Sequence, residues 1–330
     1  MKYTATANSN IALVKYWGKR DPVLFLPNNS SISMTVDGMY TMTTVGFGNY
    51  STDEFFLNGK RLADGEEFKE VQGHLDLIRH MSGESRRARV YSENTFPTAA
   101  GLASSASGFA ALSLAGSRAA GLELDYRELS ILARRGSGSA SRSIEGGFVE
   151  WVRGEKTNGT DSYGVQIASP DHWPEFRMVV AVTQTGEKKT KSRAGMAQTI
   201  KTSPMYRGWL DTVDADLDAV RKGILDKNFR QVGETAELNC LKMHSTMITT
   251  NPPIIYWNPT TVEVIHAVHD WRDEGLQAYF TIDGGPQVKV LCLEKDLNEV
   301  KRRLGEISSI KNTIIGKPGG KARLVDNHLF

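Results

Sequence analysis

The spacing of apolar residues in the first half of the chain changes repeatedly between the two-residue period of strands and the period of a helix. Residues 2–19 and 26–48 carry alternating and β-branched residues, which predicts strands, with turns at Asn28-Asn29 and Asp37-Gly38. In residues 66–83, apolar side chains recur at helical spacing and predict a helix. The same criteria predict further strands over 87–97 and 139–154 and further helices over 109–121 and 125–136. Asp125 is placed to cap the N-terminus of the last of these helices.

The second half has a different order of elements. Residues 176–184 form a continuous apolar strand pattern, and a polar, lysine-containing segment follows at 185–192. Helical patterns continue to about residue 248, and the remaining predicted elements are a helix at 259–275, a strand–turn–strand unit at 277–294 and a helix at 295–307. Strands and helices mix without regular alternation, so the predicted class is α+β, with a domain boundary near 176–186.

Composition limits the kinds of partner that the chain can have. Its 330 residues favour one large or two medium domains. The 40 basic and 38 acidic residues leave a net charge of +2, which argues against a general nucleic-acid or membrane binder. No apolar run approaches the ~20 residues of a membrane helix, and no signal-peptide pattern is found at the start. Cys240 and Cys292 are expected to be free buried thiols, as in reducing cytoplasm, which is the expected location.

The stretch Pro97–Gly108 consists almost entirely of Ala, Ser, Gly and Thr. It stands between an expected strand and an expected helix, where unpaired backbone N–H groups carry partial positive charge. Small residues would let phosphate oxygens approach, and Ser104, Ser105 and Ser107 would add hydroxyl donors. The stretch matches neither the Walker A nor the Rossmann pattern, and by composition alone a close helix-packing face explains it equally well.

Six segments together resemble one enzyme family. PTAAGLASSAS at 97–107 is similar to the phosphate-binding loop of the GHMP kinases, and the whole set resembles the mevalonate diphosphate decarboxylases within that superfamily. The other segments are NIALVKYWGKRD at 10–21, LPNNSSISMT at 26–35, RRGSGSASRSIEGGFVEW at 134–151, KSRAGM at 191–196 and DGGP at 283–286. The loop alone would indicate only the superfamily, whereas the combined set in this order indicates the family.

The resemblance implies the GHMP-kinase fold, with an N-terminal ribosomal-protein-S5-like domain over 1–180 and a C-terminal ferredoxin-like domain over 181–330. It implies the ATP-dependent decarboxylation of mevalonate 5-diphosphate to isopentenyl diphosphate, ADP, phosphate and carbon dioxide, in isoprenoid biosynthesis by the mevalonate pathway. ATP and Mg²⁺ would be the cofactors, and relatives are commonly homodimers. Phosphate would leave C3 as the carboxylate is lost, so positive charge develops there.

The family pattern also assigns catalytic roles. Asp283 would orient the proton of the 3-hydroxyl and stabilise positive charge at C3, and Lys15 would hold Asp283 ionised. Arg142 would bind the substrate carboxylate. By local sequence alone, Asp283 in Asp-Gly-Gly is more typical of a turn residue, and Arg142 is as typical of a surface arginine.

The resemblance divides the binding residues into a substrate set and a nucleotide set. Tyr16, Lys19 and Arg193 would bind the diphosphate, and the other substrate residues would be Ser137, Gly138, Ser139 and Ser192. The ATP-binding residues would be Ser92, Asn94, Pro97, Ala100, Gly101, Leu102, Ala103, Ser104, Ser105 and Lys188, with Ser104 and Ser105 near Mg²⁺. For Lys188, a solvated polar loop is an equally good explanation.

Departures from the family pattern bear on substrate detail more than on reaction type. They are Gly284 and Gln287 for the usual Ala and Asn, Glu145 for Tyr, Ala194 for an acidic residue, and the unmatched tail 312–330. Three other functions fit the same fold: decarboxylation of mevalonate 5-phosphate, phosphorylation of the 3-hydroxyl alone, and nucleotide binding without catalysis. Retention of both Asp283 and Lys15 favours decarboxylation over phosphorylation alone.

Overall fold

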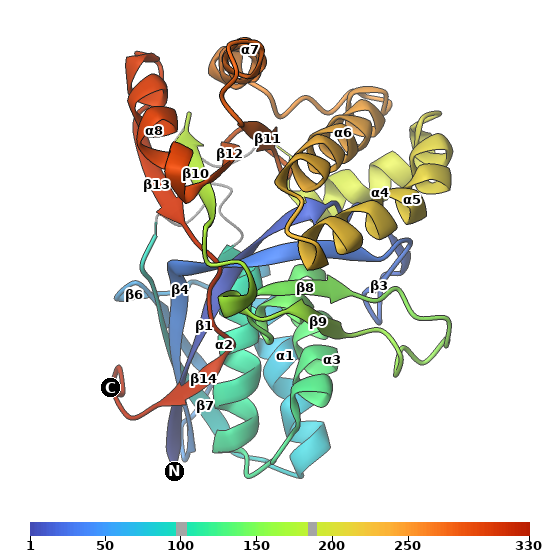
Figure 1. Ribbon diagram of the computed structural model, residues 1–330. Coiled ribbons are helices and arrows are strands. Elements are labelled where there is room, and N and C mark those ends of the chain that lie inside the picture. Colours follow the sequence, from blue (N-terminus) through green and yellow to red (C-terminus); the bar gives the residue numbers. More distant parts are fainter. Residues whose placement is uncertain (97–103, 184–189) are drawn as a thin grey trace.

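The computed structural model describes residues 1–96, 104–183 and 190–330, and the α+β class is confirmed. In this part of the chain, the strands form sheets of eight and four strands and a small two-stranded ribbon (Figure 1). The ribbon consists of β2 (Lys19–Asp21) and β3 (Leu26–Pro27). Antiparallel pairing dominates, which is typical of an α+β fold.

The eight-stranded sheet is built mainly from the first half of the chain. Its strands are β1 (Lys2–Val14), β4 (Ser31–Gly48), β5 (Glu54–Leu57), β6 (Lys60–Arg61), β7 (Arg87–Asn94), β8 (Phe148–Trp151), β9 (Gly164–Ala168) and β14 (Arg323–Val325). Their order is β14-β1-β4-β7-β5-β6, with β8 paired to β4 and β9 paired to β8. Helices α1 (Glu66–Ser82), α2 (Ser104–Ala119) and α3 (Tyr126–Gly136) share one hydrophobic core with this sheet (Figure 1).

Two local signals in this half had different outcomes. Asp125 caps α3 as expected, because its carboxylate accepts the N–H of Glu128 while the Glu128 carboxylate accepts the N–H of Asp125. The turn expected at Asp37-Gly38 was wrong, because β4 runs through it as one strand of 18 residues. Gly38 has a φ of 80°, and the register with β1 shifts beside it, so this glycine forms a bulge rather than a turn.

The four-stranded sheet belongs to the second half. Its strands β10 (Phe176–Val182), β11 (Tyr279–Thr281), β12 (Val288–Leu293) and β13 (Asn312–Gly316) follow the order β11-β12-β10-β13. Met178 and Val180 of β10 face a core that includes residues of the first sheet, whereas Val179 and Ala181 face a second core. Burial on both faces explains why residues 176–184 are apolar without alternation.

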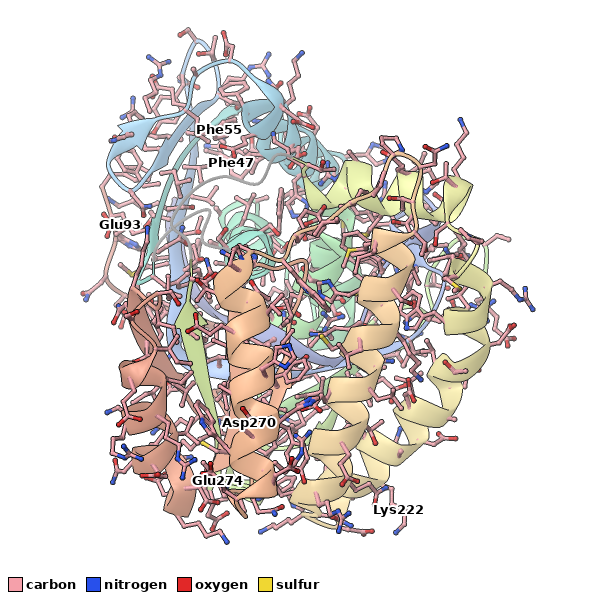
Figure 2. The ribbon with its side chains drawn as sticks, turned by 90° about the horizontal axis from the view of Figure 1, so that it is seen from above. Phe47, Phe55, Glu93, Lys222, Asp270 and Glu274 are labelled. Atoms are coloured by element: carbon pink, nitrogen blue, oxygen red, sulfur yellow. The ribbon has the colours of Figure 1, made fainter. Side chains whose placement is uncertain are left out.

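Helices of the second half cover the four-stranded sheet and connect it to the first one. The helices are α4 (Ser192–Thr202), α5 (Tyr206–Leu225), α6 (Phe229–Ile248), α7 (Pro259–Asp273) and α8 (Leu297–Glu306). Helices α7 and α8 pack on the sheet, while α6 contacts both β1 and β11. Figure 2 shows α5 and α6 side by side, and both contribute to the core between the two sheets.

The end of the chain returns to the first sheet. Strand β14 pairs with β1, with Thr4 opposite Val325, and the two termini lie at the same end of the molecule (Figure 1). The tail that the family pattern did not cover therefore supplies β13 to one sheet and β14 to the other. The domain division at 180/181 stays a prediction. Strand β14 belongs by sequence to residues 181–330 but pairs with β1 in the eight-stranded sheet.

Both cysteines are free and buried, as predicted. Cys240 lies on α6, and Cys292 lies on β12. None of the helices in the described part of the chain combines the length and the apolar character that a bilayer crossing requires.

Close packing of α6 on the second sheet leads to a test of stability. A Cβ atom at Gly233 would lie 2.1 Å from the Tyr279 ring, whereas one at Gly73 of α1 would have no atom within 4 Å. We expect Gly233→Ala to destabilise the protein by about 1–3 kcal/mol, because the ring must move within the core. Gly73→Ala, the control, should stabilise it by roughly 0.5–1 kcal/mol through helix propensity alone. Thermal unfolding of both variants measures the difference, and equal shifts would contradict the packing argument.

Candidate active site

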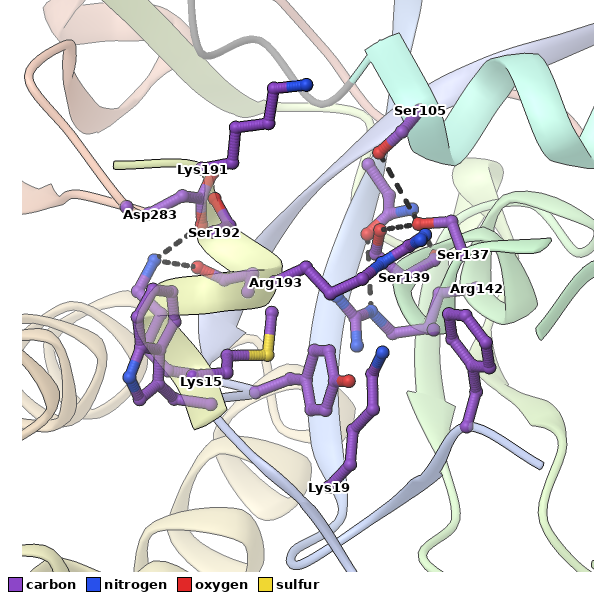
Figure 3. A pocket seen from close by; sticks show the side chains of 18 of the residues that line it. Lys15, Lys19, Ser105, Ser137, Ser139, Arg142, Lys191, Ser192, Arg193 and Asp283 are labelled. Atoms are coloured by element: carbon purple, nitrogen blue, oxygen red, sulfur yellow. Dashed lines mark hydrogen bonds and ion pairs between the residues drawn. The ribbon is translucent and has the colours of Figure 1, made fainter. Parts of the chain in front are cut away.

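A cavity of about 440 Å³ lies where β1, α2, α4 and the turn between β11 and β12 meet. Twelve of the residues proposed from the sequence line it: Lys15, Tyr16, Lys19, Ser104, Ser105, Ser137, Gly138, Ser139, Arg142, Ser192, Arg193 and Asp283. Figure 3 shows Lys15, Asp283 and Ser192 on one side, and Arg142 with Ser105, Ser137 and Ser139 on the other. The described lining has five cationic side chains and three carboxylates, so it favours an anionic ligand.

Asp283 and Lys15 form an ion pair that joins the two halves of the chain. The Lys15 Nζ lies 2.9 Å from Asp283 Oδ1 and also donates to the Ala12 carbonyl, which fixes the ammonium group just beyond β1. Burial alone would raise the pKa of Asp283, but the charges of Lys15 and Lys289 outweigh burial and hold that pKa below its ordinary value. Asp283 is therefore a carboxylate at neutral pH.

Lys289 was missed by the sequence analysis. Its Nζ lies 3.4 Å from Asp283 Oδ2, and its side chain is fully buried. The available signal was a lysine within the otherwise apolar run of β12, VKVLCL. A charged residue at such a position needs a partner, but the sequence does not show which carboxylate the strand will face.

Arg142 is a buried cation whose hydrogen bonds among the described residues go to neutral groups. It lies in the 3₁₀ helix Gly138–Ser143 and is 3% exposed. Its Nε donates to Ser33 Oγ at 2.9 Å and to Asn10 Oδ1 at 3.2 Å, and its Nη1 donates to Ser31 Oγ. Burial lowers the pKa of Arg142 to about 10, so the group stays charged. Among the described residues, no carboxylate forms an ion pair with it, so a ligand carboxylate would compensate the charge.

Lys19 and Arg193 approach the cavity beside Phe25. The Lys19 Nζ lies 3.6 Å from the centroid of the Phe25 ring, and the Arg193 guanidinium lies 5.1 Å from it. Phe25, which the sequence analysis also missed, has a φ of 56°, a left-handed conformation that is unusual for a bulky side chain. Arg193 also pairs with Glu70 at 2.6 Å, so a bound anion would compete with that carboxylate.

Tyr16 is the third candidate for anion binding. Its ring packs edge-on against the Trp151 ring, with 4.7 Å between the two ring centroids. Its hydroxyl is buried without a hydrogen-bond partner among the described residues. Burial raises the pKa of Tyr16, so the hydroxyl keeps its proton and can donate. An unsatisfied donor beside a cationic cavity is consistent with a ligand oxygen as its partner.

Ser104 and Ser105 begin α2 and also line a second cavity of about 190 Å³. This cavity contains the predicted nucleotide residues Ser92 and Asn94. Its wall includes the aromatic rings of Phe55 and Phe56, which suit a planar base. The proposed residues Pro97, Ala100, Gly101, Leu102, Ala103 and Lys188 lie outside the described residues.

Two of the departures from the family pattern have visible consequences. Glu145 lines neither cavity; burial raises its pKa and the nearby charge of Lys321 opposes this, so its carboxylate is not part of the anion site. Gln287 Oε1 accepts the backbone N–H of Thr183, which connects the turn after Asp283 to the end of β10.

Comparisons with known proteins agree with this arrangement. The family model for the diphosphomevalonate decarboxylase-like N-terminal domain matches residues 7–164, and that for the mevalonate 5-diphosphate decarboxylase C-terminal domain matches residues 178–320. The diphosphomevalonate decarboxylase of Candida albicans is 38% identical over 312 residues, which cover 90% of this chain and 86% of that protein. The human diphosphomevalonate decarboxylase is also 38% identical, over 90% of this chain and 78% of its own length.

Solved structures give the same result at the level of the fold. The mevalonate diphosphate decarboxylase of Staphylococcus aureus has a TM-score of 0.93 and 39% identity, over 98% of each chain. A structure of MDDEF in complex with MVAPP, AMPPCP and magnesium has a TM-score of 0.93 and 43% identity, over 99% of each chain. The fold is thus that of the GHMP kinases, and the chain belongs to the diphosphomevalonate decarboxylase family.

The environment of Lys19 predicts a pH dependence of anion binding. Burial and the neighbouring charge of Arg193 lower the pKa of Lys19 to about 8. The ammonium form attracts an anion, so affinity should fall as the pH rises through about 8 and the side chain loses its proton. Calorimetry with inorganic pyrophosphate between about pH 6.5 and 9 would measure this. Lys19→Met is the control, because it lacks the Lys19 ammonium group but still reports how the protonation of pyrophosphate itself changes with pH. If the affinity of the two proteins varied with pH in the same way, the prediction would be contradicted.

Proposed function

We propose that the protein catalyses the ATP-dependent decarboxylation of mevalonate 5-diphosphate to isopentenyl diphosphate, with ADP, phosphate and carbon dioxide as the other products. The observation that carries the proposal is that one cavity holds both the Lys15–Asp283 pair and the buried charge of Arg142. These groups meet two requirements of the reaction: an anion close to C3 and a cation for the carboxylate that is lost. Family membership supports the same reaction.

The substrate would lie across the cavity with its two charged ends apart. Arg142 would bind the carboxylate through its guanidinium group, assisted by the hydroxyls of Ser137 and Ser139. At the other end, Tyr16, Lys19 and Arg193 would bind the diphosphate, near Ser192, while Gly138 lies with Ser137 and Ser139 on the side of Arg142. Two fixed ends would leave C3 and its hydroxyl beside Asp283, which is the positioning that a loss of carbon dioxide requires.

Asp283 would act more by its negative charge than as a strong base. A carboxylate whose pKa is held low accepts a proton poorly, so a large proton transfer to Asp283 before the phosphoryl group arrives is unfavourable. It can still accept a hydrogen bond from the 3-hydroxyl and direct the oxygen lone pair toward ATP. When phosphate leaves C3, the fixed negative charge stabilises the positive charge that develops.

The second cavity and the start of α2 would hold the nucleotide. The backbone N–H groups of that helix terminus and the hydroxyls of Ser104 and Ser105 suit the phosphates, and Ser92 and Asn94 would lie near the base or ribose. Mg²⁺ would neutralise phosphate charge during transfer. Oxygen donors fit this ion: the two serines and the carboxylates of Glu67 and Glu70 line both cavities.

Further features extend the proposal: the homodimer and the domain division rest on the family resemblance, and the cytoplasmic location rests on the two free cysteines. The protein would be a cytoplasmic homodimer, with the nucleotide loop in residues 1–180 and Asp283 in residues 181–330.

The direct test of function is to incubate the protein with ATP and Mg²⁺ and measure ADP and carbon dioxide together. Both should appear in equal amounts with mevalonate 5-diphosphate, and much more slowly with mevalonate 5-phosphate. ADP alone would indicate phosphorylation without decarboxylation.

Asp283→Asn tests the central carboxylate. It preserves shape but removes the charge, so kcat for carbon dioxide release should fall by roughly 10²–10⁴-fold while substrate affinity changes little. Steady-state kinetics and calorimetry would separate the two effects. Asp273→Asn, on the exposed surface of α7, is the matched control and should keep the wild-type rate. A near-normal rate in Asp283→Asn would remove this carboxylate from the mechanism.

Arg142→Ala and Arg193→Ala should impair the reaction in different ways. Arg142 is proposed to hold the group that reacts, so its loss should lower kcat by about 10²-fold or more. Arg193 is proposed to bind the remote diphosphate, so its loss should mainly raise KM, with a smaller loss of kcat. Kinetics with mevalonate 5-diphosphate as the varied substrate would distinguish them, and the opposite pattern would mean that their roles are exchanged.

A further inference from the structure

Lys289 occupies a position where a charge is unfavourable. Strand β12 lies between β11 and β10, and Lys289 is opposite Thr281 on one side and Val180 on the other. Its neighbours in the strand, Val288 and Val290, are fully buried, and so is its own side chain. A lysine ammonium in the middle of an apolar sheet is costly to bury, so it calls for a reason other than packing.

The contacts of Lys289 point to Asp283. Its Nζ lies 3.4 Å from Asp283 Oδ2 and donates to the Gln287 carbonyl at 3.4 Å. Lys15 contacts the other carboxylate oxygen, Oδ1, at 2.9 Å. Oδ2 is buried and accepts no close hydrogen bond among the described residues, so the charge of Lys289 is its compensation. The two ammonium groups therefore approach different oxygens of one carboxylate.

A contact on each oxygen restricts the rotation of the carboxylate. The last torsion of an aspartate side chain has a broad, two-fold energy profile, so a single ion pair leaves the group free to swing. The Asp283 side chain is 27% exposed, and because Oδ2 is buried, Oδ1 is the oxygen that can face the cavity. With Lys289 held in the sheet, the carboxylate keeps this orientation before any ligand arrives.

The other titratable groups around Asp283 do not replace Lys289. On α6, burial lowers the pKa of His244 to about 3 and raises that of Cys240 to about 11, so both are neutral in the physiological range. The Asp283 carbonyl accepts the His244 ring N–H at 2.9 Å, which positions the backbone only. Arg142 faces Asp283 as a charge within the cavity, without a direct ion pair.

We propose that Lys289 is a positioning residue that binds Asp283 Oδ2 from within the sheet and so presents Oδ1 to the substrate hydroxyl. The inference deepens the proposed function and depends on it. Lys289 touches neither substrate nor nucleotide in this arrangement, and it acts through the orientation and charge of Asp283. Its burial then serves catalysis at the expense of the stability that an apolar residue would give at this place in β12.

Lys289→Met and Lys289→Gln test the proposal in the full-length protein with ATP, Mg²⁺ and mevalonate 5-diphosphate. We expect kcat to fall by about 10–100-fold, because the carboxylate is misoriented, with KM changed by less than about threefold. Loss of one cation raises the pKa of Asp283, and the ionised form is the active one. The acid limb of the kcat profile should therefore move to higher pH. Lys289→Arg, which keeps the charge, should restore the wild-type acid limb.

Stability measurements separate positioning from a structural role. The uncharged variants should unfold at the wild-type temperature or above it, whereas Val290→Ala, the control in the same strand, should unfold earlier and keep the wild-type pH profile. A kcat within twofold of wild type, a fall in kcat without the shift of the acid limb, or failure of both uncharged variants to fold would each overturn the proposal. Absence of carbon dioxide release by the wild-type protein would instead refute the proposed function.

Discussion

The ion pair between Lys15 and Asp283 is the contact on which the site depends. One partner follows the first strand of the chain, and the other lies in the turn between β11 and β12, so the pair exists only when both sheets are in place. Helix α6 fixes this relation by packing on β1 and β11 together, and the Asn239 side chain accepts the Lys15 backbone N–H. The geometry of the candidate site is thus a property of the whole fold rather than of either sheet.

Around that pair, the cavity holds positive charges that are partly or fully removed from water. Arg142 is surrounded by hydroxyl and amide groups, and Lys19 is placed over an aromatic ring. At neutral pH such cations stay mostly charged while losing hydration, which makes them strong partners for an arriving anion. Without a bound anion, the loss of hydration of these cations lowers the stability of the folded protein. The neutral acceptors around Arg142 and the aromatic ring beside Lys19 offset this loss only in part.

The elements that local sequence predicted well have strong local causes. The cap at Asp125 and the two-sided burial of β10 follow from a few neighbouring residues. The turn predicted at Asp37-Gly38 was wrong because a glycine with positive φ occurs in β-bulges as well as in turns. Only the pairing of β4 with β1 decides between the two. The cavity residues were predicted from motifs that resemble those of a family. Because the motifs of a family belong to one shared fold, the resemblance also indicates which distant residues come together. Lys289 and Phe25 lie outside those motif roles, and their significance depends on contacts between distant segments.

The pairing of β14 with β1 has a consequence for how the chain is made. Strand β1 leaves the ribosome long before its partner on that edge, residues 323–325, is synthesised. The free edge of β1 is therefore exposed until those residues have been made, and an unpaired strand can associate with another chain. Nascent chains would gain from a chaperone that covers this edge.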